Sequence, residues 1–495
     1  MEIVTASYVA SQVNSDSTVI PGGFGCCGHP DLYTHALRQR YENEGKPKSL
    51  TLLFASGAGD KQGKGLDQLA AKGMIKKAIG GFWGFCPALT NAARQGLIEG
   101  HNWPMGVISH LFRDITRGAL GHITHIGLGS YIDPDIGGGC IENHAPSLIS
   151  KLEIQGQQHL FYPAFSIDFS LLRGTRADEK GNISMDEEVA YHDALLQAMA
   201  AKNSGGKVAV QVKELVKALP CQDVHIPAHL VDFVTIAQDP LDHLPSYGEL
   251  TTADHQPEPE NIAKHYIVQR ALHELPQTRA CINLGIGIPA LLGKYINKTQ
   301  TDNSFTVESG IFNGQPKYGL SFGDSSEPDA IIGQSDLFAY YDGGGVDVAF
   351  LGFAEIDAQG CVNASLLGQR MTGVGGFINI AQSAKKLVLC GTLTTGALHA
   401  AQENGLLCIK NEGNITKFVS HVQQITIDLA HPTYRNKDVI IITERATFSF
   451  KNKVLTVMEI SKGFSIADLQ QHINFPISVS PSLTTINIRQ VLHEL

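Results

Sequence analysis

The sequence predicts an α/β protein made of two related open α/β/α domains with mostly parallel sheets. Three observations carry this prediction: short β-branched runs alternate with stretches of helix length, glycine turns join them, and the pattern occurs twice along the chain. Glycine supplies 51 of the 495 residues, so many turns can adopt positive φ or approach a ligand closely. A chain of this length exceeds what one core usually organises.

The clearest expected strands are the β-branched runs at residues 208–212, 387–389 and 439–442. Between the two halves, residues 239–260 hold four prolines and several acids without apolar periodicity, a composition typical of a linker. We therefore expect an N-terminal α/β domain over residues 1–238 and a C-terminal α/β domain over residues 261–495.

A loose internal duplication supports the two halves. In the first, a strand at 18–20 runs into Gly23-Phe24-Gly25, and Pro30 opens a helix. In the second, a strand at 281–284 runs into Gly285-Ile286-Gly287, and Pro289 opens a helix.

The duplication continues beyond these turns. The next strand ends in Ala55-Ser56-Gly57 in the first half and in Glu308-Ser309-Gly310 in the second, and residues 178–183 resemble residues 357–362. A reactive carboxylate at this strand end would therefore belong to the second half alone.

Composition excludes several classes of function. The formal net charge of −10 argues against a nucleic-acid partner, since phosphate binding needs a basic face. Residues 1–20 carry no signal-peptide pattern, and no apolar stretch is long enough to span a bilayer. The nine cysteines form no C-x-x-C pair and the histidines no H-E-x-x-H motif, so we expect reduced thiols, no metal site and a cytoplasmic protein.

Both glycine turns fit dinucleotide fingerprints. Residues 23–28 match G-x-G-x-x-G, residues 285–290 match the form that ends in Ala, and Glu308 lies where a ribose-binding acid would fall. An NAD-linked enzyme is therefore an alternative. Against it, His29-Pro30 and Pro289 stiffen the two helix entrances, and the first half has no acid at the matching strand end.

Residues 306–316 are the most informative segment. Glu308 closes an apolar strand and is followed at once by glycine-rich turns. Ligands of open parallel sheets bind off the carboxyl ends of the strands, so this side chain would project into a binding crevice. From this segment alone, a structural carboxylate that accepts bonds from loop N–H groups is the favoured interpretation.

Several segments, read in order, resemble class I CoA-transferases, in particular the acetate/propionate branch in which both halves are fused in one chain. The similar segments are residues 22–31, 109–114, 127–139, 173–183, 306–316, 341–347, 373–378, 390–396 and 442–446. Each is modest by itself, but the ordered set covers nearly the whole chain.

The resemblance implies an enzyme that transfers coenzyme A between short-chain carboxylic acids by ping-pong chemistry, with Glu308 as the nucleophile and a glutamyl-CoA thioester as the intermediate. It implies coenzyme A as a substrate, no permanently bound cofactor, and a homo-oligomer, either a dimer or a tetramer. The residues that it places near bound coenzyme A are Gly23, Phe24, Gly25, Arg370, Gly373, Gly375, Gly376 and Phe377.

Such a reaction builds oxyanions and reactive acyl intermediates. Backbone N–H donors are therefore expected among residues 22–25 and at Gly375 and Gly376, and Phe312 and Phe377 are candidates for excluding water.

The sequence also departs from the family pattern. Met105 stands where the family commonly has Gln, and the turn at 311–314 is bulkier than the family's. These differences leave the acids that are exchanged open. Two other classes of function also remain: an acyl-CoA thioesterase on the same fold, and a non-catalytic coenzyme A-binding regulator.

Overall fold

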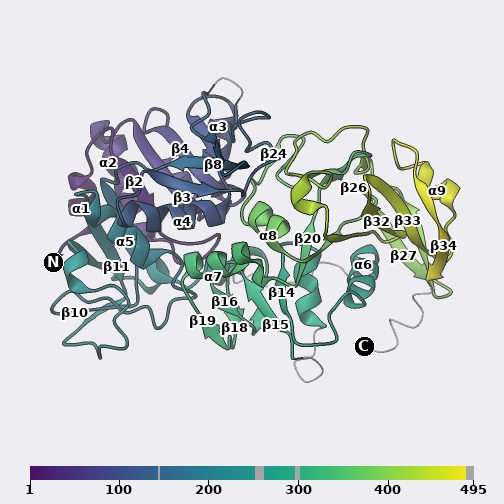
Figure 1. Ribbon diagram of the computed structural model, residues 1–495. Coiled ribbons are helices and arrows are strands. Elements are labelled where there is room, and N and C mark those ends of the chain that lie inside the picture. Colours follow the sequence, from purple (N-terminus) through teal and green to yellow (C-terminus); the bar gives the residue numbers. More distant parts are fainter. Residues whose placement is uncertain (143–144, 251–260, 296–301, 487–495) are drawn as a thin grey trace. The chain divides into compact units, whose positions relative to one another are not determined.

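The structure, a computed structural model, describes residues 1–142, 145–250, 261–295 and 302–486 (Figure 1). The chain groups into two compact units that interleave along the sequence. Unit 1 contains the described residues up to 250 together with residues 307–339 and 371–379. Unit 2 contains the described residues within 261–306, 340–370 and 380–486.

This grouping differs from a division at one linker. Residues 307–339 and 371–379 bond to the N-terminal part of the chain: the Gln334 N–H donates to the His192 carbonyl, and the Trp83 N–H donates to the Thr372 carbonyl. Within the expected linker, the short helices η3 (Pro240–His243) and η4 (Tyr247–Leu250) belong to unit 1, and residues 251–260 lie outside the described residues.

Unit 1 is organised by an eight-stranded sheet in which every pairing is parallel. Its strands, in spatial order, are β1 (Glu2–Ile3), β13 (Phe233–Ile236), β11 (Lys207–Val212), β9 (Phe169–Arg173), β2 (Thr18–Pro21), β3 (Leu50–Ser56), β4 (Ile75–Phe82) and β5 (Glu99–Asn102). The expected strands at 18–20 and 208–212 are confirmed.

The connections leave β2 and β9 in opposite directions: β2 leads outward to β3, and β9 leads outward to β11. Right-handed crossovers therefore put their helices on opposite faces of the sheet. The helices of this part are α1 (Ala6–Gln12), α2 (Asp31–Glu44), α3 (Pro87–Arg94), α4 (Met105–Thr116) and α5 (Ala194–Asn203), where α1 packs on α2 and α4 on α5 (Figure 1). The point where the strand order reverses is where open α/β sheets bind ligands.

Unit 1 also receives short elements from the second half of the sequence. They are the antiparallel pair β16 (Ile311–Phe312) and β19 (Ala330–Ile331), the antiparallel pair β17 (Gln315–Pro316) and β18 (Ser325–Ser326), and most of helix α7 (Gln334–Tyr340). A separate antiparallel sheet contains β6 (Gly121–Thr124), β8 (Gln157–Pro163) and β7 (Ser150–Ile154).

Unit 2 has a mixed sheet that begins as a parallel one. In spatial order its strands are β15 (Ser304–Val307), β14 (Cys281–Leu284), β20 (Val348–Gly352), β25 (Lys386–Cys390), β31 (Asp438–Ile442), β32 (Ala446–Lys451), β33 (Val454–Ser461) and β34 (Ser478–Ile486). The pairings from β15 to β31 are parallel, and β32 is antiparallel to both neighbours. Mostly parallel sheets with covering helices confirm the α/β class.

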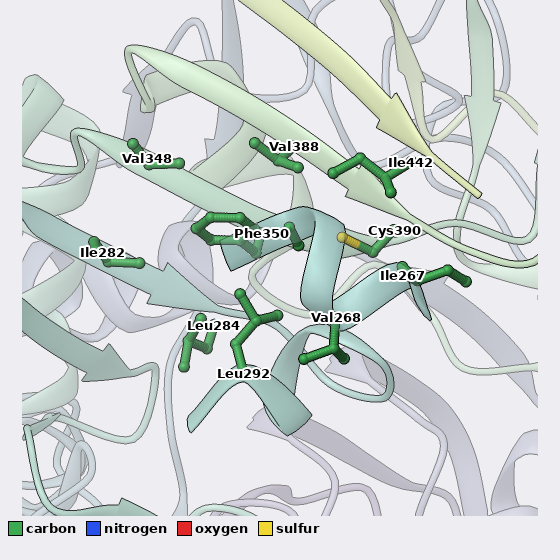
Figure 2. Close-up of a cluster of buried hydrophobic side chains, with 11 residues drawn as sticks. Ile267, Val268, Ile282, Leu284, Leu292, Val348, Phe350, Val388, Cys390 and Ile442 are labelled. Atoms are coloured by element: carbon green, nitrogen blue, oxygen red, sulfur yellow. The ribbon is translucent and has the colours of Figure 1, made fainter. Parts of the chain in front are cut away.

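The core of unit 2 lies between this sheet and helix α6 (Ile262–Leu272). Figure 2 shows Ile267 and Val268 of α6 packed against Phe350 and Cys390 of the sheet. Residues that alternate along parallel strands thus supply one apolar face, which the helix covers.

Unit 1 and unit 2 contain the same turn, which supports the internal duplication. Asp178 Oδ1 accepts N–H bonds from Lys180 at 3.0 Å and Asn182 at 2.9 Å. Asp357 Oδ1 accepts bonds from the N–H groups two and four residues further on, at 3.0 and 2.9 Å. Both turns use a carboxylate in place of a backbone carbonyl, as Asx turns do.

One element of the duplication differs from expectation. Pro30 precedes the α-helix α2, but Pro289 opens a 3₁₀ helix, η5 (Pro289–Lys294). The N–H groups of Leu291 and Tyr295 bond to carbonyls three residues back, the spacing of a 3₁₀ helix. The second glycine turn therefore lacks the long α-helix on which a dinucleotide fingerprint depends.

Candidate active site

Glu308 lies in the turn directly after β15 and is only 9% exposed. Its neighbours fix this turn in unit 1: the Ser309 hydroxyl donates to the Gly323 carbonyl at 2.8 Å, and the Ile332 N–H donates to the Gly310 carbonyl at 2.9 Å. Val307 and Ile311, on either side, pack with Ala190. The carboxylate is thus buried on a rigid support.

The surroundings of Glu308 oppose its ionisation. Burial raises the pKa of Glu308 to about 7, although the Gly376 N–H, which bonds to the carboxylate, acts in the opposite direction. A Cβ added at Gly376 would lie 2.8 Å from Glu308 Oε2 and 3.1 Å from Phe338 Cζ. Only glycine lets the main chain approach the carboxylate this closely.

The loop that carries Gly376 connects β24 (Arg370–Met371) to α8 (Phe377–Ser383). The end of β4 and the start of α4 hold it: the Gly375 N–H donates to the Gly81 carbonyl at 3.1 Å, and the Gly375 carbonyl accepts from the Met105 N–H at 2.8 Å. Gly373 has a φ of +73°, and a Cβ there would lie 2.6 Å from the Gly81 oxygen. The structure therefore brings Gly376 against Glu308, whereas Gly373 and Gly375 of the same loop contact the end of β4.

The other glycine turn, which carries Gly23, Phe24 and Gly25, follows β2 at the reversal point of the unit 1 sheet. It lies against the segment that supports Glu308, since a Cβ at Gly323 would touch the Phe24 ring at 2.8 Å. Phe24 itself is buried, and its ring stacks on His192. This turn therefore lies near Glu308, since residue 323 contacts both the turn and the segment that supports Glu308.

Three N–H groups of this turn already have partners. Those of Gly22 and Phe24 donate to the carbonyls of Leu171 and Cys27, and that of Gly25 donates to the Ser56 hydroxyl at 3.1 Å. At the other loop, the Gly375 N–H is also bonded within the protein. Of the donors expected from the sequence, the Gly376 N–H is the one directed at the carboxylate.

An aromatic row links the two loops. Ring centroids of Phe82 and Phe85 lie 5.5 Å apart, those of Phe85 and Phe322 6.4 Å, and those of Phe322 and Phe24 6.0 Å. Phe82 also lies 3.2 Å from the position of a Cβ at Gly375. This row, together with Phe338, forms an apolar environment near the site, and Phe24 is the one member of the row that sequence reasoning had named.

The aromatic residues named from the sequence have other surroundings. Phe312 is half-buried in the antiparallel pair β16–β19, and Phe377 is half-buried at the first position of α8. Arg370 belongs to unit 2, where it is exposed and pairs through β24 with β23 (Leu366–Leu367). The contribution of these residues to coenzyme A binding stays a prediction.

A buried ion pair lies next to the first glycine turn. Arg173 Nε lies 2.9 Å from the Glu188 carboxylate, and His243 Nε2 lies 3.1 Å from it. Although burial opposes ionisation, these two groups hold the pKa of Glu188 at about 2. Two cavities of about 30 and 10 Å³ flank Arg173, and both are of the size of one or a few water molecules.

Asn102 is, like Phe338, a residue that sequence reasoning missed. It ends β5, is fully buried and bonds to both the β4 end and the Gly376 loop. A polar residue at the end of a buried strand was the available signal, but its partner is 272 residues away in the sequence.

Within the described ranges, no group of three or more His, Cys, Asp or Glu side chains has the arrangement of a metal site. Over the same ranges, no helix combines the length and the apolar character needed to cross a membrane.

Comparison with known proteins decides the family. The family model described as "Coenzyme A transferase" matches residues 4–237. Acetate CoA-transferase of Escherichia coli O157:H7 is 33% identical over 98% of this chain and 94% of its own length. Caffeate CoA-transferase of Acetobacterium woodii is also 33% identical, over 98% of this chain and 95% of its own length.

The chain belongs to the coenzyme A transferase family. A crystal structure of the acyl-CoA transferase of Escherichia coli O157:H7, described as a thioester complex with CoA, superimposes with a TM-score of 0.91 at 32% identity. The match covers 99% of this chain and 96% of that one. The protein is therefore an enzyme with the fused tandem fold of this family, and it transfers coenzyme A between carboxylic acids.

Proposed function

We propose that this CoA-transferase exchanges coenzyme A between short-chain carboxylic acids through a covalent intermediate on Glu308. The observation that carries the proposal is the setting of Glu308: a carboxylate at a strand end, buried, and bonded by one directed N–H group from Gly376. A carboxylate suits this reaction because its chemistry with a thioester is that of the substrates themselves.

The first half-reaction has two steps. A Glu308 carboxylate oxygen attacks the thioester carbon of the acyl-CoA, and the C–S bond breaks to give an acyl–glutamyl anhydride and the coenzyme A thiolate. The thiolate then attacks the Glu308 carbonyl carbon, which forms a glutamyl-CoA thioester and releases the first acid as its carboxylate.

The second half-reaction is the reverse with a second acid. Its carboxylate attacks the glutamyl thioester, the thiolate leaves, and the thiolate then attacks the acyl carbon of the new anhydride. The new acyl-CoA leaves and Glu308 is regenerated. No net proton, electron or water is consumed, so the exchange needs no further reagent.

The apolar surroundings of Glu308 fit these steps. The main chain at Gly376 approaches the carboxylate closely, Phe338 lies beside Gly376, and Phe82 lies beside Gly375, so apolar side chains border the loop next to Glu308. Water exclusion protects an anhydride and a thioester from hydrolysis. Partial burial also makes the carboxylate a stronger nucleophile once it is ionised, because its hydration is weak.

Short-chain acids are the substrate class that we propose. The E. coli relative is named for acetate and the A. woodii relative for caffeate, at the same identity to this chain. In this chain, Met105 packs against the loop that carries Gly376, with its Cε 3.5 Å from the position of a Cβ at Gly375. A wall of bulky apolar side chains favours small acyl groups.

Other parts of the account are also proposals. We infer that the enzyme works without a permanently bound cofactor, as a homo-oligomer, and in the cytoplasm. The cysteines support the last point, because all nine are free thiols in the structure, including the exposed Cys221. The glycine turn at Gly23–Gly25 and residues Arg370 and Phe377 remain candidates for contacts with coenzyme A.

The test is to compare transfer with hydrolysis. Purified enzyme is incubated with acetyl-CoA or propionyl-CoA, with and without a second short-chain acid, and new acyl-CoA and free coenzyme A are quantified. We expect new acyl-CoA only when the second acid is present, and parallel double-reciprocal plots. Steady release of free coenzyme A at the same rate without an acceptor would instead identify a thioesterase.

A further inference from the structure

The Asn102 side chain lies at the centre of a hydrogen-bond network in unit 1. Its Nδ2 donates to the carbonyls of Gly80 at 2.7 Å and Gly81 at 2.6 Å. Its Oδ1 accepts from the Val374 N–H at 2.9 Å and from the Tyr131 hydroxyl. The amide thus uses both donors and both acceptor positions, and its residue is fully buried.

These bonds join two parts of the molecule that are far apart in the sequence. Gly80 and Gly81 belong to β4, and Val374 belongs to the loop that leads to Gly376. The Gly81 carbonyl accepts a second bond from the Gly375 N–H, so Asn102 holds the loop both directly and through Gly81.

Hydrogen bonds define the position of this loop. Between β24 and α8 it forms no helix or strand, and it is bonded to Trp83, to Met105 and to the ends of β4 and β5. Space is tight: a Cβ at Gly373 would lie 3.0 Å from Asn102 Nδ2. Two residues after Val374, the Gly376 N–H bonds to the Glu308 carboxylate.

We propose that Asn102 is a positioning residue for Glu308: its amide fixes the loop at residues 372–376 and thereby holds the Gly376 N–H on the carboxylate. This inference rests on the proposed role of Glu308 as nucleophile. It adds to that role a residue from the first half of the sequence that does not touch the reacting atoms.

This positioning role predicts a specific change in the pH dependence of kcat/KM. The Gly376 N–H stabilises the ionised form of Glu308, so a displaced donor raises the pKa of this carboxyl further. Asp336 of α7 pairs with Arg113 and Lys77 of β4 pairs with Glu99. Burial raises the pKa of Asp193 to about 6, but this carboxyl accepts from Ser109 and not from the loop. A shift of the acid limb of kcat/KM in loop variants should therefore report the Gly376 donor.

The experiment compares four variants with the wild type. Asn102→Ala removes the whole network, Asn102→Asp keeps only the acceptor, and Tyr131→Phe removes one donor to that acceptor. Asn182→Ala is the matched control: this half-buried amide bonds to Asp178 and the Ala228 N–H in the same unit, away from the loop. The readouts are kcat/KM against pH and the yield of the coenzyme A adduct on Glu308.

We expect Asn102→Ala to lower kcat/KM by about tenfold to a hundredfold, the usual effect of a small misplacement in an active site, and to move its acid limb to higher pH. Asn102→Asp and Tyr131→Phe should give smaller shifts in the same direction, and they decide the matter if Asn102→Ala does not fold. Asn182→Ala should lower the thermal midpoint without moving the acid limb.

Folded Asn102 and Tyr131 variants with the wild-type acid limb and rate would overturn the inference. An equal shift of the acid limb in Asn182→Ala would also overturn the inference, because the shift would then result from a general loss of stability. Failure of the proposed function is a separate result: the wild-type enzyme itself would carry no adduct on Glu308.

Discussion

At the scale of single residues, the ionisation of Glu308 controls the reaction. Burial raises the pKa of Glu308 to about 7, and only its ionised form can attack a thioester. We therefore expect kcat/KM for acyl-CoA to decrease about tenfold per pH unit below neutrality and to level off above it. Initial rates in overlapping buffers measure this, and a flat profile down to about pH 5 would contradict it.

Ionisation of the buried Glu308 carboxyl group should lower the free energy of unfolding. Its pKa is higher in the folded protein than in the unfolded chain, so the folded state loses stability as pH rises from the unfolded pKa of 4.5 to about 7. Glu308→Gln, which stays neutral, should be more stable than the wild type by about 3 kcal/mol above neutrality.

Thermal midpoints of both proteins measured at several pH values test this prediction. The advantage of Glu308→Gln should be large in mildly alkaline buffer and should vanish in acid, where both side chains are neutral. An advantage that does not depend on pH would show that ionisation of Glu308 is not its cause.

Gly376 lies where a larger side chain would collide with the Glu308 carboxylate. A Cβ there would lie 2.8 Å from Glu308 Oε2, closer than ordinary contacts allow. Gly376→Ala should therefore displace the carboxylate and reduce kcat by about a hundredfold. Steady-state kinetics measure the effect, with Gly343→Ala as control, because no atom lies within 4 Å of a Cβ at that exposed glycine. Equal kinetics for Gly376→Ala and the wild type would exclude this steric role.

Glu308 stands in a recognisable local pattern, an acid that ends an apolar strand and precedes glycine turns, but the ordered resemblance to the family singled it out as the nucleophile. Gly373, Gly375 and Gly376 were named from the same resemblance. Asn102 and Phe338 were not, because each acts on the site through contacts with residues distant in sequence. Reactive residues can be recognised from sequence patterns, whereas the residues that position them are recognised from packing in the structure.

At the scale of elements, the duplicated turn predicts matched effects in the two halves. Asp178 and Asp357 are both buried and accept the same pair of backbone N–H groups. Asp178→Ala and Asp357→Ala should each lower the free energy of unfolding by about 1–3 kcal/mol, because buried N–H groups lose their acceptor.

Unfolding of each variant, followed by circular dichroism, measures these losses. Asp223→Ala is a suitable control, since this aspartate is exposed in a loop of unit 1. A loss in only one of the two turns would show that the repeated sequence does not have a repeated structural role.

The alternation of strands and helices was predictable because each strand carries its own apolar run and each turn its own glycine. The expected runs at 387–389 and 439–442 lie within β25 and β31. The grouping of residues 307–339 and 371–379 with unit 1 was not predictable. It results from long-range bonds, such as Gln334 to His192, that leave no periodic trace in the sequence.

At the scale of the whole molecule, full-length similarity and the local site agree. The relatives and the superimposed crystal structure cover 98–99% of this chain, so the family applies to both halves. Within unit 1, Glu308 from the second half of the sequence meets structural support from the first half, including residue 190 and the ends of β4 and β5. Fusion of both halves in one chain keeps these partners together.

The covalent role of Glu308 is tested most directly by mass spectrometry of the peptide that contains it. The enzyme is incubated with acetyl-CoA or propionyl-CoA, with and without borohydride, next to Glu308→Gln. We predict a coenzyme A adduct on Glu308, and its reduction to the alcohol only when acyl-CoA and borohydride are both present. An unmodified Glu308 in enzyme that is turning over would contradict the account.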